Sequence, residues 1–222
     1  MGKNTILVFC AHPDDQIFGP GGTLAKYANK GKKIHTFIFS YGEGSHPHFK
    51  KEIITDTRVK EAERADKIIG GNGVEFFGLP DDKNFEEEYE KQNIHQRLKD
   101  IILKCEPVKI FTHSEDDHHV HHKIVNKAVL KAVDESKFKT DVYTFDVWNF
   151  FGVKRNTSPK LVVDISDTFK TKIKALKIFK SQLSFFSYTI MNNFLYLKVY
   201  FNDFIEGLIY KKRFAEVFYK VR

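Results

Sequence analysis

The chain has few cysteines, and both of them, Cys10 and Cys105, lie within or beside apolar runs. This placement is typical of reduced core thiols, so we expect neither a disulfide nor a cysteine metal site. No apolar run approaches the ~18 residues of a membrane-spanning helix. The first residues also lack the apolar region of a secretory signal peptide. We therefore expect a soluble, cytoplasmic protein with no integral membrane segment.

Several ligand-binding motifs are missing as well. The glycines near Gly21 and Gly22 fit neither the GxxxxGK[ST] nor the GxGxxG pattern, which argues against a phosphate-binding loop. The net charge is +7, but the lysines are spread along the chain, and no zinc-finger, helix-turn-helix or RNP pattern accompanies them. Diffuse positive charge favours solubility, and it would also suit an anionic substrate or a membrane surface. We expect no nucleic-acid partner.

No linker rich in Pro, Gly or Ser divides the chain, so we expect one domain over residues 1–222. Short apolar runs alternate with amphipathic segments, a pattern typical of an α/β, Rossmann-like three-layer sandwich with a mostly parallel sheet. The expected strands are 7–11, 33–40, 74–77, 108–112, 141–147 and 161–165. The expected helices are 23–29 with Thr23 as N-cap, 51–69, 86–105, 123–133 and one capped by Ser166 or Asp167 that runs to about 180.

The C-terminal segment, residues 183–219, is rich in Phe and Tyr. We expect a mostly helical stretch that ends near Arg213, followed by a short strand. Its aromatic residues favour a place in the core or in the wall of a pocket over a membrane anchor.

The first expected strand ends abruptly in the polar sequence His12-Pro13-Asp14-Asp15. Pro13 lacks an N–H and biases the preceding residue toward extended geometry, so the strand should stop there. An imidazole beside two carboxylates is costly to place at the end of a core strand unless a cation is held there. A solvated turn in which the aspartates cap a helix is the alternative interpretation.

A second polar segment, residues 113–122, follows the expected strand at 108–112 and contains five histidines. Both polar segments follow strands that should be neighbours, so they can converge at the carboxyl edge of the sheet. Two imidazoles and one carboxylate with an open fourth position are typical of a hydrolytic zinc site. A third polar loop carries His46 and His48, which we interpret as surface residues in preference to ligands.

Four segments, taken in order, match motifs of a known family. They correspond to an HPDDE loop with a following glycine pair, and to TRxxE, LPD and DxHxDH motifs. The matching residues are 12–16 with Gly21 and Gly22, 57–61, 79–81 and 116–121. On these residues the chain resembles the PIG-L/LmbE-like N-deacetylases, zinc hydrolases of N-acetylglucosamine-type substrates.

The resemblance implies a role for each matched position. It makes His12, Asp15 and His121 the ligands of one zinc ion per chain. Asp14 becomes the general base that takes a proton from the metal-activated water. His118 becomes the residue that stabilises the oxyanion formed from the acetamide carbonyl.

Two of the departures from the family pattern lie in the polar segments. Gln16 stands where the family has Glu, so the orientation of a ligand or the metal affinity can differ. Val120 stands where the family has Asp, which removes one group that would orient His118. Asp116 or Asp146 could supply that carboxylate instead. Neither departure removes a ligand or the base, so we expect an active enzyme.

The resemblance also makes Arg58 and Asp81 contacts to sugar hydroxyls, although an exposed helical Arg58 paired with Glu61 would fit the sequence as well. The leading hypothesis is a zinc-dependent hydrolase that removes the acetyl group from a small amino-sugar substrate. The alternatives are a metal-dependent phosphoesterase and a non-catalytic carbohydrate- or anion-binding protein of the same fold. A homo-oligomer is compatible with all three.

Overall fold

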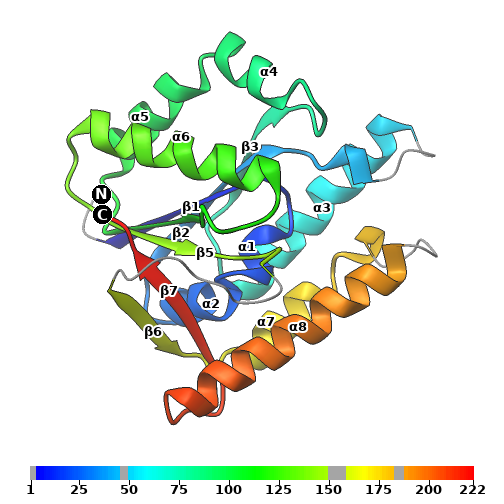
Figure 1. Cartoon of the computed structure of the whole chain (residues 1–222), viewed down its shortest axis with the longest axis vertical. Helices are drawn as coiled ribbons and strands as arrows, with labels where there is room; N and C mark the ends of the chain where they lie inside the picture. Colours follow the sequence, from blue (N-terminus) through cyan, green and yellow to red (C-terminus); the bar gives the residue numbers. More distant parts are fainter. Residues whose placement is uncertain (1–3, 46–49, 150–158, 183–187) are drawn as a thin grey trace.

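The computed structural model describes residues 4–45, 50–149, 159–182 and 188–222, with side-chain surroundings from residue 196 onward in the last range. Within these residues, seven strands form one sheet in the order β3-β2-β1-β4-β5-β7-β6 (Figure 1). All neighbours are parallel except β7, which runs antiparallel to both β5 and β6. The strands are β1 (Thr5–Cys10), β2 (Lys33–Ser40), β3 (Val74–Leu79), β4 (Lys109–His113), β5 (Asp141–Phe145), β6 (Lys160–Asp164) and β7 (Ala215–Lys220).

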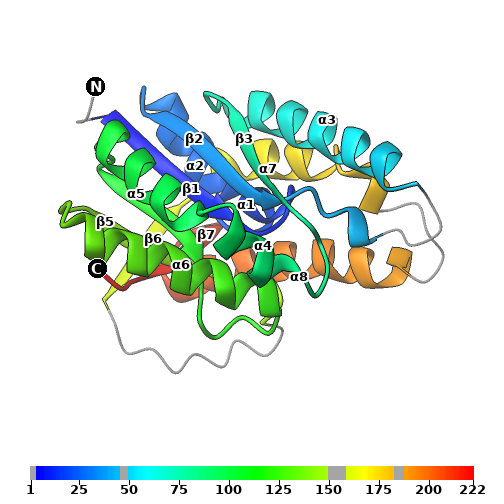
Figure 2. The same cartoon turned by 90° about the horizontal axis from the view of Figure 1, so that it is seen from above.

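Helices cover both faces of the sheet, so the predicted three-layer α/β sandwich with a mostly parallel sheet is confirmed (Figure 2). One layer holds α2 (Gly21–Asn29), α3 (Lys51–Ile69), α7 (Phe169–Leu176) and α8 (Tyr188–Ile209), and its core includes Leu24, Ala62 and Leu176. The other layer holds α4 (Phe85–Lys91), α5 (Ile94–Cys105) and α6 (Val120–Ser136), and its core includes Phe85, Leu98 and Val129. Among the helices described, none is long and apolar enough to span a membrane.

The central strand β1 lies between β2 and β4, as its continuous apolar sequence predicts. Every β1 residue is buried, and Val8 pairs with Thr36 on one side and Phe111 on the other. Cys10 is buried and, like Cys105, is a free thiol. The carboxyl ends of β1 and β4 are therefore adjacent, and the Ala11 N–H donates to His113 Nε2 at 3.0 Å. The two polar segments meet at this edge.

The start of α2 differs from the sequence expectation. The helix begins at Gly21, so Thr23 lies inside its first turn and is not the N-cap. The Glu216 carboxylate of β7 accepts hydrogen bonds from the Gly22 and Thr23 N–H groups, at 2.9 and 2.7 Å. A side chain almost 200 residues away thus supplies the acceptor that the local sequence was expected to provide.

Two predicted helices have different limits in the structure. The expected helix at 86–105 is divided into α4 and α5 by Asn93, whose φ of 51° lies in the left-handed region that Asn tolerates well. The break allows Phe85 and Tyr89 of α4 and Ile94 of α5 all to be buried. The α7 helix starts after Thr168, later than the expected caps at Ser166 or Asp167, and ends at Leu176.

The C-terminal segment forms the predicted helix and terminal strand, as α8 and β7. Phe214 and Phe218 are buried, but several large apolar residues on α8 are exposed. The expectation that the aromatic residues of this segment would all lie in the core or a pocket wall is therefore wrong for one face of α8. That face lies on the outside of the molecule because the opposite side of α8 packs on β7 and is joined to α7 by the buried Lys172–Asp203 ion pair (Figure 1).

Candidate active site

The turn after β1 brings His12 and Asp15 together. The His12 N–H donates to Asp15 Oδ2 at 2.8 Å, and the Gln16 side-chain amide donates to the Pro13 carbonyl oxygen at 2.8 Å. A short helix, α1 (Asp15–Phe18), begins at Asp15, and its N-cap residue Asp14 makes no side-chain capping bond. The loop is therefore not a simple solvated turn with capping aspartates, because Asp15 is buried and turned toward the imidazole of its own loop.

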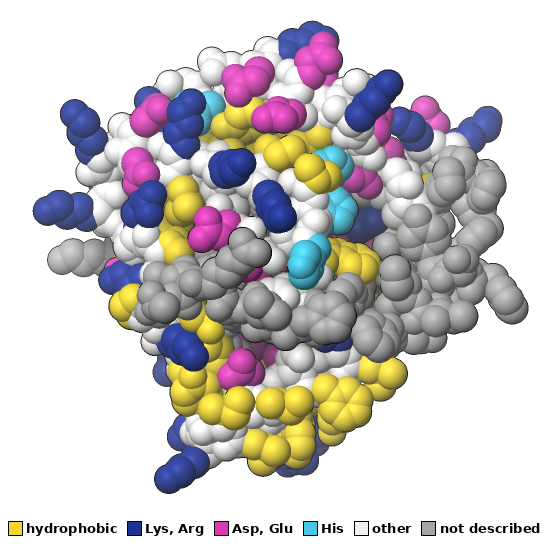
Figure 3. Space-filling view, viewed as in Figure 1, with side chains coloured by type: hydrophobic (Ala, Val, Ile, Leu, Met, Phe, Trp, Pro, Cys, Tyr) yellow, Lys and Arg dark blue, Asp and Glu magenta, His cyan; other side chains and the backbone are white. Residues whose placement is uncertain are grey.

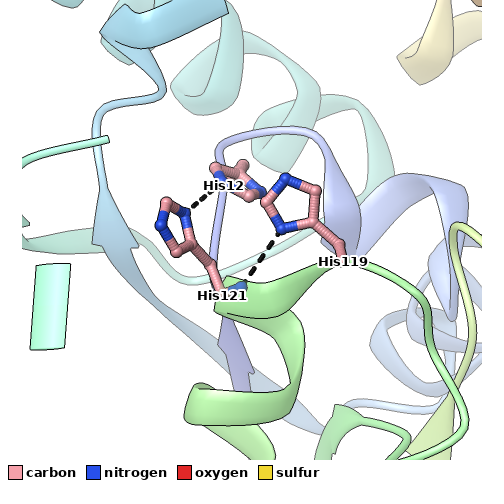
Figure 4. A group of neighbouring side chains, drawn as sticks. All are labelled: His12, His119 and His121. Atoms are coloured by element: carbon pink, nitrogen blue, oxygen red, sulfur yellow. Dashed lines mark hydrogen bonds between the residues drawn. The ribbon is translucent and has the colours of Figure 1, made fainter. Parts of the chain in front are cut away.

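The second polar segment ends in the first turn of α6. His119 is the N-cap of this helix, and its Nδ1 accepts a hydrogen bond from the His121 N–H at 3.2 Å. This cap places His121 and His122 as consecutive helical residues, so their side chains leave the helix in different directions. His119 and His121 flank the His12 ring (Figure 4). His122 has no exposed surface.

Three ligand-type atoms form a nearly equilateral triangle. His12 Nδ1 lies 3.3 Å from His122 Nε2, and Asp15 Oδ2 lies 3.4 Å from each of these nitrogens. Donor atoms bound tetrahedrally to zinc at about 2.0–2.1 Å are about 3.3–3.4 Å apart. The three atoms therefore have the spacing of one face of a tetrahedral zinc site.

The electrostatics of the cluster also favour a cation. Burial by itself would lower the pKa of His12, but Asp15 and Asp81 outweigh burial and raise it to about 10. Two carboxylates thus attract positive charge to the position between the loops. A bound cation would neutralise these carboxylates as a protonated His12 does. The donor set and its charge therefore both fit a divalent metal.

Asp117 and His113 surround the buried His122 ring. Asp117 Oδ2 lies 3.1 Å from His122 Nδ1 and also accepts hydrogen bonds from the Val147 and Trp148 N–H groups, at 2.7 and 3.0 Å. The His113 ring stacks on His122 with centroids 3.7 Å apart. Burial would raise the pKa of Asp117, but the contact with His122 outweighs it and holds that pKa below its usual value. An ionised Asp117 fixes the His122 ring with Nε2 toward Asp15.

The Nε2 edge of the His12 ring faces Asp81 and His121, whereas its Nδ1 edge faces Asp15 and His122. Asp81 Oδ1 is 3.2 Å from His12 Nε2 and 3.3 Å from His121 Nδ1. The His121 ring also stacks on Phe85, with centroids 4.2 Å apart. A carboxylate that accepts from Nε2–H of an imidazole leaves Nδ1 as its metal-binding nitrogen. Asp81 thus orients His12, and His121 belongs to this side of the cluster.

Arg58 and Asp14 line the neighbouring cavity, whose volume is about 350 Å³. Arg58 Nη2 lies 3.3 Å from Asp14 Oδ1, and Arg58 Nη1 donates to the Gly42 carbonyl and to Ser45 Oγ, both at 3.1 Å. Burial raises the pKa of Asp14, although the Arg58 charge acts in the opposite direction. Arg58 is buried and is not the exposed helical residue of the alternative interpretation.

Histidine side chains reach the molecular surface near apolar ones (Figure 3).

The structure does not bring all predicted residues into this cluster. His118 is exposed, and its Nδ1 lies 3.0 Å from the Trp148 carbonyl oxygen. Asp146 instead lines a separate cavity against β7 and α8. His46 and His48 lie outside the described residues.

Sequence reasoning gave no role in the site to His119, His122 or Asp117, and treated the two histidines as exposed or helix-initial residues. The spacing D-x-H-x-x-H occurs twice in residues 116–122, once from Asp116 and once, one residue later, from Asp117. The sequence expectation used the match that begins at Asp116. In the structure, the residues of the match that begins at Asp117 lie in or beside the triangle. The second register could have been found only by testing both, because adjacent aspartates and adjacent histidines satisfy the same spacing.

A mostly parallel α/β sheet with a His–Asp cluster at the carboxyl ends of two neighbouring strands defines a class of protein with a candidate metal-dependent active site. The family model for PIG-L, GlcNAc-PI de-N-acetylase, matches residues 7–133, and the chain belongs to this family. The matched region contains every residue of the cluster.

Two curated relatives differ in activity. The chain is 26% identical over 193 residues to a probable N-acetyl-α-D-glucosaminyl L-malate deacetylase of Bacillus cereus, covering 82% of this chain and 84% of the relative. It is 30% identical over 121 residues to the 4-oxalmesaconate hydratase of Pseudomonas putida, covering 52% of this chain and 45% of the hydratase. The match thus spans less than half the length of the hydratase.

Among solved structures, the N,N'-diacetylchitobiose deacetylase of Pyrococcus horikoshii superposes with a TM-score of 0.79 at 18% identity. The superposition covers 98% of this chain and 84% of that protein. At this identity the likeness establishes the shared fold.

Proposed function

We propose that this protein is a zinc-dependent hydrolase that removes the acetyl group from an N-acetylated amino sugar of the N-acetylglucosamine type. The observation that carries the proposal is the triangle formed by His12 Nδ1, Asp15 Oδ2 and His122 Nε2. Membership in the PIG-L family supports the reaction, and the deacetylase relative supports the substrate class. We place His122 in the ligand set and His121 outside it.

Zinc bound by these residues would polarise the acetyl carbonyl and supply a water of lowered pKa as the nucleophile. Asp14 lies beside the ligand Asp15, and its carboxylate faces the cavity. In the proposed reaction Asp14 takes a proton from the attacking water and later gives it to the departing sugar nitrogen. The carbonyl carbon gains the water oxygen, the C–N bond breaks, and acetate and a free amine are released.

His119 is the proposed donor to the carbonyl oxygen as negative charge develops on it. Its Nδ1 accepts the His121 N–H, so the hydrogen of the neutral ring is on Nε2 and can be donated. Burial, with the nearby His12 and His122, lowers the pKa of His119 to about 3, which keeps the ring neutral. We propose His119 for this role in place of His118, which is exposed.

Arg58 and Asp81 have positioning roles in this proposal and are not primarily sugar contacts. Arg58 holds Asp14, and Asp81 holds His12. The substrate class therefore depends on the remaining wall of the cavity, which includes Trp148, Val120 and Gln182.

The test measures acetate release from a panel of N-acetylglucosamine derivatives, together with metal content. We expect about one zinc per chain, whereas a phosphoesterase would favour two metals. Asp14→Asn should lower acetate release by roughly 10²–10⁴-fold and leave the metal content unchanged. His119→Ala should lower it by roughly 10²–10³-fold, and His118→Ala should change it little. Zinc-loaded protein that releases no acetate from any substrate would contradict the proposal and favour a non-catalytic binding protein.

The hydratase relative is the one observation that favours a second function, the addition of water to a carbon–carbon double bond. The same preparation would be assayed with an unsaturated oxo-tricarboxylate by its ultraviolet absorbance. A loss of absorbance that requires His122, with no acetate release, would assign the site to hydration.

A further inference from the structure

One side of α8 is apolar and faces outward. Seven large residues on it are between 38% and 63% exposed, and we call them the α8 outer face: Leu197, Tyr200, Phe201, Phe204, Ile205, Leu208 and Ile209. Figure 3 shows apolar side chains gathered over this helix and not covered by other parts of the molecule. The other exposed residue between 196 and 209 is the uncharged Asn202, so no exposed carboxylate interrupts this face.

The opposite side of α8 is fixed to the protein, so the helix lies flat along the surface. Asp203 is buried in an ion pair with Lys172 of α7, with Asp203 Oδ2 and Lys172 Nζ 2.9 Å apart. A side chain at Gly207 would lie 2.8 Å from the Arg213 backbone, so the helix approaches the following turn closely. The outer face therefore cannot turn inward without breaking these contacts.

Exposed basic side chains lie on the helix next to α8 and just after the end of α8. Lys170 and Lys174 are exposed on α7, and Lys177 is exposed at its C-cap. This helix packs beside α8, where Phe169 meets Tyr200 at the edge of the outer face with ring centroids 5.4 Å apart. Three further exposed basic residues follow the end of α8: Lys211, Lys212 and Arg213. We call these six residues the basic rim. Two carboxylates lie nearby: Asp167, which is exposed two residues before α7, and Asp164, whose Oδ2 lies 3.9 Å from Lys212 Nζ.

We propose that α8 docks the protein on an anionic lipid bilayer, with the outer face in the interfacial region and the basic rim against the headgroups. An apolar helix face that lies parallel to the surface and is bordered by lysines has the composition of interfacial membrane-binding helices. Lysines near an anionic surface add to binding by electrostatic attraction. A second copy of the chain would complement the apolar face but would bring a rim of the same charge toward this one. The charge therefore favours lipid.

The test is co-sedimentation of the full chain with 100 nm vesicles. One set contains phosphatidylcholine only, and the other contains 30% phosphatidylglycerol. We expect binding to the anionic vesicles, which weakens as the salt concentration rises, and little binding to the neutral ones.

Two sets of variants separate the apolar and the charged contributions. Phe201→Ser, Ile205→Ser and Leu208→Ser combined should lower the partition coefficient by at least about tenfold, because they remove buried apolar area from the bound state. Lys170→Gln, Lys174→Gln and Lys177→Gln combined should lower it by about fivefold per lysine and reduce its salt dependence. Circular dichroism and thermal melting would establish that each variant folds.

Matched substitutions elsewhere serve as controls. Ile53 and Leu103 are exposed apolar residues outside α8, and their change to Ser should leave vesicle binding unchanged. Lys104→Gln, Lys127→Gln and Lys131→Gln remove the same charge from α5 and α6, in the opposite layer, and should have a smaller effect.

Equal binding to both vesicle types, or full binding by the α8 variant, would overturn the proposal. A dimer in light scattering that the same α8 substitutions dissociate, without vesicle binding, would assign the face to a second copy. The inference is independent of the proposed chemistry, since Asp14→Asn should bind vesicles like the wild type.

Discussion

At the scale of single residues, Asp15 is the point on which the cluster converges. Its Oδ2 lies within 3.4 Å of nitrogens from His12, His113 and His122, and it accepts the His12 N–H. His121 shares a helical turn with His122 but contacts Asp81 and Phe85 instead. A one-residue difference in register along α6 thus separates a proposed metal ligand from a residue of the cavity wall.

The first prediction compares these neighbouring histidines. His122→Ala should reduce zinc to well below one ion per chain after dialysis, because it removes one corner of the triangle. His121→Ala should retain the metal, since His12, Asp15 and His122 remain in place. Metal content measured by inductively coupled plasma spectrometry checks both. If His121→Ala lost the metal and His122→Ala kept it, His121 would be the ligand, as the motif that begins at Asp116 predicts.

The second prediction concerns Asp117, which orients His122. Asp117→Asn should weaken zinc binding by about 10–100-fold, because the amide does not hold the ring as an ionised carboxylate does. The matched variant Asp116→Asn should bind zinc like the wild type. Competition with a chromogenic chelator measures both affinities, and equal loss in the two variants would contradict the role given to Asp117.

At the scale of secondary-structure elements, a buried ion cluster joins α2, α7, α8 and β7. Lys172 Nζ lies 2.7 Å from Glu216 Oε1 and 2.9 Å from Asp203 Oδ2, and it donates to the Gly19 carbonyl at 3.1 Å. Glu216 also caps α2, which follows α1 and the turn that carries His12 and Asp15. The terminal strand therefore fixes the helix behind the candidate active site.

The third prediction tests this cluster. Glu216→Gln should lower the free energy of unfolding by about 3–5 kcal/mol, because it leaves the buried Lys172 with one carboxylate and weakens the α2 cap. Glu135→Gln, which alters an exposed ion pair with His95 and Lys99, should leave the unfolding midpoint almost unchanged. Urea denaturation followed by circular dichroism measures both. Equal midpoints for the two variants would contradict the structural role of Glu216.

At the scale of the whole molecule, a cation at the triangle would connect segments 110 residues apart in the sequence, the loop after β1 and the start of α6. Neither segment holds the three donors alone, so the complete site exists only in the folded chain. Metal binding should therefore stabilise the fold.

The fourth prediction follows from this linkage. Zinc at 100 times its dissociation constant should stabilise the protein by about 2.7 kcal/mol. For a chain of this size that corresponds to a rise in melting temperature of roughly 5–10 °C. Differential scanning fluorimetry with zinc or with a chelator checks the shift. His122→Ala should show almost none of it, and an equal shift in that variant would point to another site.

The sequence by itself determined the alternation of strands and helices, the adjacency of β1 and β4, and the two polar segments at their ends. These features follow from local apolar patterns, Pro13 and the order of the segments. All of these can be identified from residues that are close together in the sequence. Nearby residues also sufficed to identify His12, Asp14 and Asp15 as candidates. The break at Asn93 was missed, because the apolar spacing continues across it.

Only the tertiary structure decided which histidine faces Asp15. The sequence 116–122 satisfies the same spacing in two registers, and the choice depends on where the His119 cap starts α6 and on the bonds from Asp117 to Val147 and Trp148. The Glu216 cap and the exposed α8 outer face likewise depend on β7 inserting between β5 and β6. Contacts between distant segments fix these features, and a local pattern does not record them.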